Sequence, residues 1–136
     1  MNDELKKNKK LVEVLLKNTL NGTIKWKPKK APSVLREGTE DIYHQYYEGH
    51  FKDNTIAIYE RKYQYYNDMT DSFLWGSEYC LALVKYQLSS LYHNDQIVSL
   101  APINTQDTII NALFLSVTQK SMSSDDIIDK LLEDED

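Results

Sequence analysis

Residues 55–66 read TIAIYERKYQYY, and this stretch decides the fold. β-Branched and aromatic residues dominate it, which is typical of a β-strand. Successive side chains of a strand point to opposite faces, so the two isoleucines share one face while Tyr59, Tyr63 and Tyr65 share the other. The aliphatic face predicts a core on one side of a sheet. The tyrosine face is then left towards solvent or a partner.

The segments on either side predict further strands of one antiparallel sheet. Gly49 and Asp53-Asn54 indicate a turn ahead of residues 55–66. The strand that begins at Tyr79 is apolar on both faces, so we expect it in the centre of the sheet. A turn at His93-Asn94-Asp95 leads into the last strand. The expected strands are residues 23–27, 41–47, 55–66, 79–91 and 96–100.

Apolar residues recur with helical spacing near both ends of the chain. Residues 5–20 predict one amphipathic helix, which ends at Asn21-Gly22. A longer helix is expected from Asn104 to about Lys120, and a short amphipathic helix from Ser123. The long helix has an apolar stripe that should lie across the sheet, made of Ile109, Ile110, Leu113, Phe114 and Val117. The short helix carries Ile127, Ile128, Leu131 and Leu132.

These elements predict an α+β fold. An antiparallel sheet of four to five strands is expected with an N-terminal helix and with one long and one short C-terminal helix. The chain length of 136 residues suits a single domain spanning residues 1–136, with about 1–4 and 133–136 frayed.

Charge is divided unevenly along the chain, although the net charge is only −5. Residues 1–36 hold ten Lys and Arg against three Asp and Glu. These lysines could form a basic face for phosphate, but the acidic remainder of the chain makes a nucleic-acid partner unlikely. No apolar run approaches the ~20 residues that cross a bilayer, and the N-terminus has no apolar signal core. We therefore expect a cytoplasmic protein that does not enter a membrane.

The residue patterns of catalysis and metal binding are missing from the sequence. Cys80 is the only cysteine and lies in an apolar strand, which favours a buried structural thiol. The spacing of His44, His50 and His93 matches no metal-ligand pattern. The four glycines are not clustered, so no phosphate loop is expected. We expect no catalytic residue, no metal and no cofactor, and hence no enzyme.

The apolar trio Phe73-Leu74-Trp75 stands among acidic residues between Asp68 and Glu78. We expect it at the tip of a loop between two strands, where exposed apolar side chains favour a recognition surface. The alternative is that the trio folds back as a plug on the sheet.

Several of these segments together resemble a known group of proteins. The N-terminal helix with Leu15-Leu16, its end at Gly22, the strand residue Trp26 and the Tyr-rich strands are similar to those of widespread small uncharacterised α+β proteins of Gram-positive bacteria, their phages and mobile elements. The resemblance covers almost the whole chain. It implies a fold and no activity, so no catalytic residue is carried over.

The leading functional hypothesis is a non-enzymatic protein-binding accessory, immunity or inhibitor protein, encoded by a phage or mobile element. The chain has ten tyrosines and three phenylalanines, and tyrosine gives rigid amphipathic contact area at low entropic cost. Its partner would be a host or mobile-element protein, or a second copy in a homodimer. The expected partner-binding residues are Tyr43, Tyr47, Tyr59, Tyr63, Tyr65, Phe73 and Trp75.

Two other classes of function stay open. The first is a small-molecule sensor with a tyrosine-lined pocket between the sheet and the C-terminal helix, ringed by Tyr63, Tyr65, Tyr79 and Tyr86. The second is nucleic-acid binding through the N-terminal lysines, with Trp26 and tyrosines stacking on bases.

Overall fold

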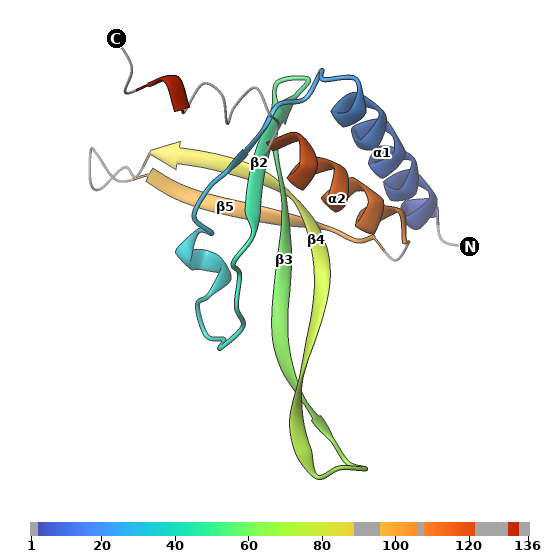
Figure 1. Ribbon diagram of the computed structural model, residues 1–136, viewed down its shortest axis with the longest axis vertical. Helices are drawn as coiled ribbons and strands as arrows, with labels where there is room; N and C mark the ends of the chain where they lie inside the picture. The colour runs from blue at the N-terminus through green and yellow to red at the C-terminus, as the bar shows by residue number, and fades with distance from the viewer. Residues whose placement is uncertain (1–2, 89–95, 106–107, 122–130, 134–136) are drawn as a thin grey trace.

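The computed structural model describes residues 3–88, 96–105, 108–121 and 131–133 (Figure 1). Its centre is a five-stranded antiparallel sheet in which each strand pairs with the next along the chain, in the order β1-β2-β3-β4-β5. Helices α1 and α2 lie side by side on one face of that sheet. The elements are α1 (Asp3–Leu20), β1 (Trp26–Pro28), the 3₁₀ turn η1 (Ser33–Leu35), β2 (Tyr46–Phe51), β3 (Asn54–Asn67), β4 (Ser72–Leu88), β5 (Gln96–Ile103) and α2 (Ile109–Ser121).

The α+β class, the antiparallel sheet and the N-terminal helix are confirmed. The expected short helix from Ser123 falls mostly on residues 122–130, outside the described part of the chain, as does the turn at 93–95. Leu131 and Leu132 are exposed. No helix in the ranges that the structure describes is both long enough and apolar enough to cross a membrane.

The connection from α1 to β1 is fixed by local hydrogen bonds. Gly22 has a φ of 81°, the left-handed conformation that ends a helix at low cost. A side-chain hydrogen bond then links β1 to α1 across the turn: the indole N–H of Trp26 donates to Oγ1 of Thr19 at 2.9 Å. Both side chains are buried, so this bond satisfies a polar group that would otherwise be costly to bury.

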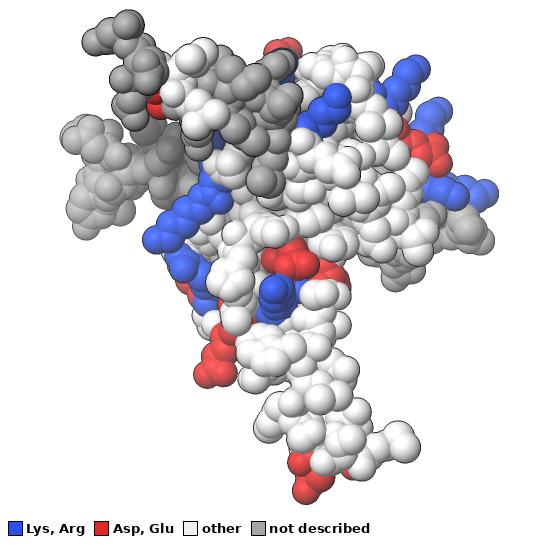
Figure 2. Space-filling model, in the orientation of Figure 1, with Lys and Arg blue, Asp and Glu red and all other residues white. Residues whose placement is uncertain are grey.

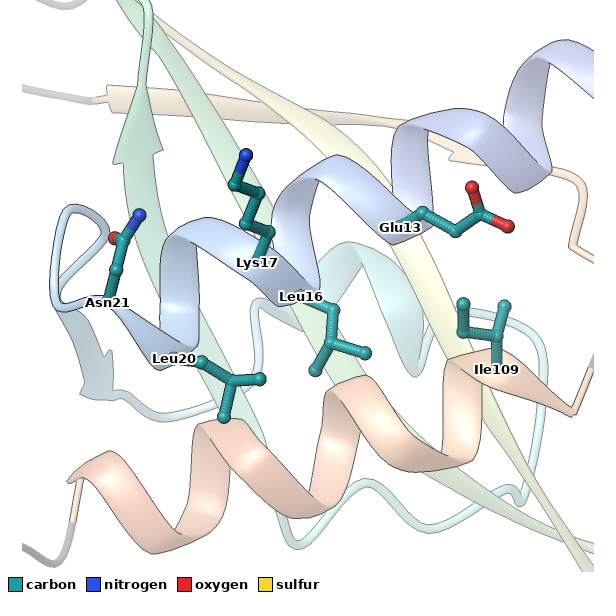
Figure 3. Close-up of a pocket in the computed structure, with 6 residues that line it drawn as sticks. All are labelled: Glu13, Leu16, Lys17, Leu20, Asn21 and Ile109. Atoms are coloured by element: carbon teal, nitrogen blue, oxygen red, sulfur yellow. The ribbon is translucent and has the colours of Figure 1, made fainter.

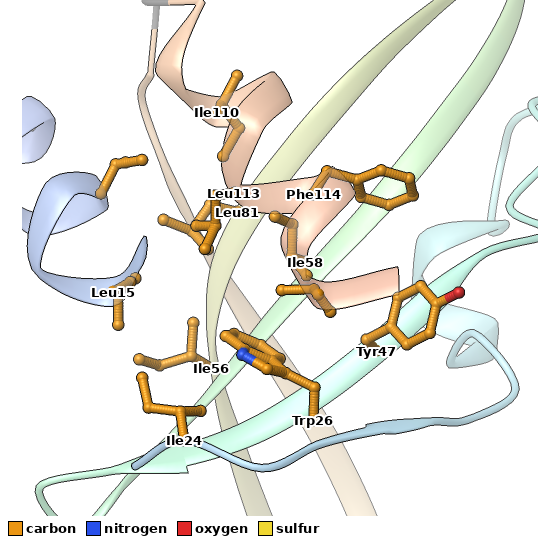
Figure 4. Packing of buried hydrophobic residues seen from close by; sticks show 12 residues of the cluster. Leu15, Ile24, Trp26, Tyr47, Ile56, Ile58, Leu81, Ile110, Leu113 and Phe114 are labelled. Atoms are coloured by element: carbon orange, nitrogen blue, oxygen red, sulfur yellow. The ribbon is translucent and has the colours of Figure 1, made fainter. Parts of the chain in front are cut away.

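The main core lies between the two helices and the sheet (Figure 4). Ile56 and Ile58 point into it, as the alternation of residues 55–66 predicted. The stripe of α2 lies against them, and Phe114 stacks on Tyr79 with ring centroids 4.2 Å apart. The buried members of this core are Val12, Leu15, Ile24, Trp26, Tyr47, Ile56, Ile58, Leu81, Ile110, Leu113, Phe114 and Val117.

A second, smaller core lies on the opposite face of the sheet and covers part of the tyrosine face. The segment between β1 and β2, including η1, packs there through Ala31 and Leu35. Tyr59 is only 5% exposed, stacked on Tyr46 at 5.7 Å and met edge-on by Tyr43 at 5.8 Å. The expectation that Tyr59 faces solvent or a partner is therefore corrected, because the chain's own segment 29–45 occupies that face.

Several element boundaries differ from those expected. The second strand starts at Tyr46 rather than at residue 41, and it runs through Gly49 without turning. A Cβ at Gly49 would lie 2.9 Å from side-chain atoms of Ile24 and Trp26, so this glycine makes room for the tryptophan ring. The chain reverses instead at Lys52 and Asp53, whose φ angles are 49° and 64°.

Further differences concern β4, β5 and α2. β4 begins at Ser72, so Phe73, Leu74 and Trp75 belong to a strand and not to a loop tip. β5 extends to Ile103, and α2 begins at Ile109 rather than at residue 104. The expected central position of the strand starting near Tyr79 is confirmed, since β4 pairs with both β3 and β5.

Candidate functional site

β3 and β4 are longer than their neighbours and project from the body as a two-stranded arm (Figure 1). β2 pairs with β3 only as far as Tyr59, and β5 pairs with β4 only as far as Leu81. Beyond those points the two strands pair with each other, apart from one bridge between Ile42 and Lys62. We call residues 61–78 the arm.

Charged groups hold the base of the arm to the body. Nε of Arg61 donates to Oδ2 of Asp41 at 2.7 Å, and Nη1 donates to Oε1 of Glu78 on the facing strand. The guanidinium also lies over the ring of Tyr63, 4.7 Å from its centroid. These hydrogen bonds, with that to Asp41 the strongest, raise the pKa of Arg61. Figure 2 shows red and blue atoms gathered where the arm leaves the body.

One face of the arm carries Tyr63, Tyr65 and Leu74. Cross-strand pairing places Tyr63 opposite Gly76 and Tyr65 opposite Leu74. A Cβ at Gly76 would lie 2.8 Å from the Tyr63 ring, so the ring lies directly over the glycine. The rings of Tyr63 and Tyr65 are 6.2 Å apart, and Tyr65 is exposed.

The other face of the arm is also aromatic. Tyr66 stands opposite Phe73, and their rings meet edge-on at 5.5 Å. Trp75 stands opposite Gln64 on the same face. Phe73 is 67% exposed and Trp75 is 53% exposed, which is unusual for such large apolar side chains.

The tip of the arm is acidic. It contains Asp68 and Asp71, with Met69 between them 95% exposed. The phenol of Tyr66 donates to Asp71, whose φ of 51° helps to close the turn. Residues 63–77 include no Lys or Arg. In Figure 2 the arm is accordingly white, with red atoms at its end.

The predicted partner-binding residues are therefore divided between the arm and the body. Tyr63, Tyr65, Phe73 and Trp75 lie together on the arm. The three that lie in the body are Tyr43, Tyr47 and Tyr59, and Tyr47 packs against Phe114 in the main core.

Sequence reasoning missed two exposed residues of the arm, namely Tyr66 and Met69. Pairing residues 55–67 with 72–84 across a turn at Asp68–Asp71 would have found them.

A buried carboxylate in the body of the protein accepts three side-chain hydrogen bonds. Glu48 on β2 is 4% exposed. Its Oε2 accepts hydrogen bonds from the phenols of Tyr46, at 2.7 Å, and Tyr86, and its Oε1 accepts one from Nζ of Lys29 at 3.0 Å. Burial alone would raise the pKa of Glu48, but these three donors outweigh it and the pKa is lowered.

The same contacts act on the phenols. Burial and the hydrogen bond to Glu48 raise the pKa of both Tyr46 and Tyr86. An ionised carboxylate that already accepts three hydrogen bonds and has a lowered pKa is a poor general base. The arrangement fits a structural role, in which Glu48 ties the segment after β1 to the centre of the sheet.

The surroundings of the other side chains that could react do not activate them for chemistry. Burial, and to a smaller extent Glu78, raises the pKa of the Cys80 thiol to about 12, so little thiolate forms near neutrality. Nδ1 of His50 is 3.0 Å from Oγ1 of Thr55. In the described ranges, no three His, Cys, Asp or Glu residues are placed to hold a metal ion.

The four tyrosines considered for a small-molecule pocket lie in three separate places. Tyr79 stacks on Phe114 on the helix side of the sheet, whereas Tyr86 contacts Glu48 on the opposite side. Tyr63 and Tyr65 lie on the arm. The four side chains therefore do not ring one cavity.

A shallow apolar groove runs between α1 and α2 (Figure 3). Leu16, Leu20 and Ile109 form its floor, with Glu13, Lys17 and Asn21 along the rim. Leu20 is exposed. The groove offers apolar contact, but Glu13, Lys17 and Asn21 at its rim do not form a recognisable catalytic or metal-binding arrangement.

Comparison with protein-family models, curated proteins and solved structures gives no match.

Proposed function

We propose that the protein is a non-enzymatic binding protein of the accessory, immunity or inhibitor kind, and that its arm contacts a partner protein. The observation that carries this proposal is the exposure of Phe73 and Trp75 on a hairpin that projects beyond the sheet. Large aromatic side chains are the usual anchors of protein interfaces. A two-stranded hairpin with both faces wet is also marginally stable by itself, so a partner that covers it would stabilise it.

The composition of the arm indicates what the partner should offer. The arm has aromatic side chains on both faces, two carboxylates at its tip and no cation from residue 63 to 77. A complementary surface is an apolar cleft with basic side chains where Asp68 and Asp71 would arrive. Arg61 and its two carboxylate partners at the base reduce the freedom of the arm, which lowers the entropic cost of binding.

The test compares the wild-type protein with a double variant of the arm and with a single control variant, and each substitution replaces an exposed apolar side chain by serine. Phe73→Ser with Trp75→Ser removes the anchors of the arm, and Leu115→Ser removes an exposed apolar side chain from α2, away from the arm. Each protein is immobilised and exposed to extract of the source organism, and retained proteins are identified by mass spectrometry. Thermal melting first shows that each variant is folded.

We expect a specific protein to be retained by the wild-type protein and by Leu115→Ser but not by the arm variant. Retention of the same proteins by all three would show that the arm is not the contact. Light scattering tests whether the arm instead binds a second copy of this chain. A wild-type dimer that becomes a monomer in the arm variant would overturn the proposal of a different partner, because the arm would then bind a second copy.

A further inference from the structure

A cavity of about 450 Å³ opens at the edge of the sheet formed by β1 and β2. It shares no residue with the arm. Its lining is Thr23, Lys25, Lys27, Lys29, Glu48 and His50.

Strand alternation explains why these lysines gather. Ile24 and Trp26 point into the main core under the helices, so the lysines at 25 and 27 point to the other face of the sheet. Antiparallel pairing places Lys27 opposite Glu48, and Lys25 continues the same face towards His50.

The cavity has more positive than negative charge. Its single carboxylate, Glu48, already accepts hydrogen bonds from two phenols and from Lys29. Among the residues described here, no carboxylate forms a salt bridge with Lys25 or Lys27. His50 also lines the cavity, and its Nδ1 lies 3.0 Å from Oγ1 of Thr55.

We propose that this cavity binds a small polyanion that carries at least two anionic groups, such as a diphosphate. Side chains two residues apart on a strand start about 6.6 Å from each other, so one ligand can reach both unpaired ammonium groups. The volume suits a small molecule, and lysines supply only hydrogen-bond donors. Edge lysines also discourage pairing between sheets, and the experiment separates that role from binding.

The experiment titrates sodium pyrophosphate into ¹⁵N-labelled full-length protein at constant ionic strength and follows backbone amide shifts. We expect saturable shifts concentrated at residues 23–29 and 48–50. Lys25→Gln with Lys27→Gln should weaken binding by about tenfold or more, since two charge-assisted contacts are lost. The control is Lys6→Gln with Lys7→Gln, which removes the same charge from exposed positions of α1.

The site is supported if the control variant keeps its affinity for pyrophosphate within about twofold and the cavity variant loses binding. Two results would overturn it: no saturable shift with pyrophosphate, or an equal loss of affinity in both variants, which would show attraction to general positive charge. All four lysines are exposed, so these substitutions leave the core intact, and a melting curve for each variant checks this.

Discussion

Replacing the buried Glu48 by glutamine should destabilise the fold measurably near neutral pH. The amide has nearly the same shape but offers one acceptor and one donor group in place of two acceptor oxygens. If its oxygen meets the phenols of Tyr46 and Tyr86, its NH₂ group faces the ammonium of Lys29. If it is turned the other way, the fully buried phenol of Tyr46 loses its acceptor.

The magnitude follows from these contacts. A hydrogen bond to a charged group is worth about 1.5–3 kcal/mol, and a neutral one about 1 kcal/mol. The bond from Lys29 counts for less, because half of its side chain is exposed. We expect a loss of about 2–3 kcal/mol in the free energy of unfolding. For 136 residues the unfolding entropy is about 0.29 kcal/mol per kelvin, so the melting temperature should fall by about 7–10 °C.

The effect should depend on pH in one direction. The pKa of Glu48 is lower in the folded than in the unfolded protein, so its stabilisation is complete above the unfolded pKa of about 4.3 and is lost as pH falls through the folded pKa. Glutamine does not titrate. The difference between the two proteins in urea unfolding should therefore shrink from neutral pH to strongly acidic pH.

The control is Glu40→Gln, which removes the same charge from an exposed loop position and should change stability by less than about 0.5 kcal/mol. A Glu48→Gln protein as stable as this control at neutral pH would refute the role of the buried network. A loss that is the same at neutral and strongly acidic pH would refute its electrostatic origin.

Three further predictions concern packing and exposure. Gly49→Ala should cost about 1–3 kcal/mol in urea unfolding, because the new methyl group meets the buried Trp26 ring; unchanged stability would contradict the close approach. Trp75→Phe should remove most of the acrylamide quenching of tryptophan fluorescence, since the remaining Trp26 is buried; undiminished quenching would contradict this assignment of Trp75 as the exposed and Trp26 as the buried tryptophan. Cys80 should react with iodoacetamide at about pH 8 roughly 10³-fold more slowly in the folded than in the urea-unfolded protein, and equal rates would contradict a pKa of about 12.

Short-range alternation was enough to predict the helix side of the sheet. Ile56 and Ile58 are two residues apart, and the stripe of α2 recurs every three to four residues, so each pattern reports directly on which face is buried. The end of α1 at Gly22 was predictable for a similar reason, because a left-handed residue is needed there.

The opposite face depends on contacts that no local pattern contains. Tyr43 meets Tyr59 only because the irregular segment 29–45 crosses the sheet, and that segment has one proline and one glycine but no periodicity. Glu48 on β2 is charged, and no local pattern in the sequence predicts that it is buried. Its burial depends on Tyr86, which is 38 residues away in sequence.

The arm was missed for a different physical reason. Phe73-Leu74-Trp75 is short, is followed by Gly76 and stands among acidic residues, all of which favour a loop. Gly76 does not mark a turn, because the cross-strand register places it under the Tyr63 ring in the middle of a paired strand. The turn itself uses Asp71 at a positive φ and no glycine, so its position was not marked by the usual residue.

The excess of tyrosine pointed to β3, which carries Tyr63, Tyr65 and Tyr66 of the arm, but it did not separate exposed tyrosines from buried ones. Tyr46 is buried with its hydroxyl bonded to Glu48, and Tyr59 is covered by the chain's own segment. On the arm, the larger exposed fractions belong to Phe73 and Trp75 and not to the tyrosines beside them. Because apolar area removed from water contributes most to binding, substitution of Phe73 or Trp75 should weaken the complex more than substitution of Tyr65. Under the proposed function, the tyrosines beside Phe73 and Trp75 would mainly hold those two side chains in position.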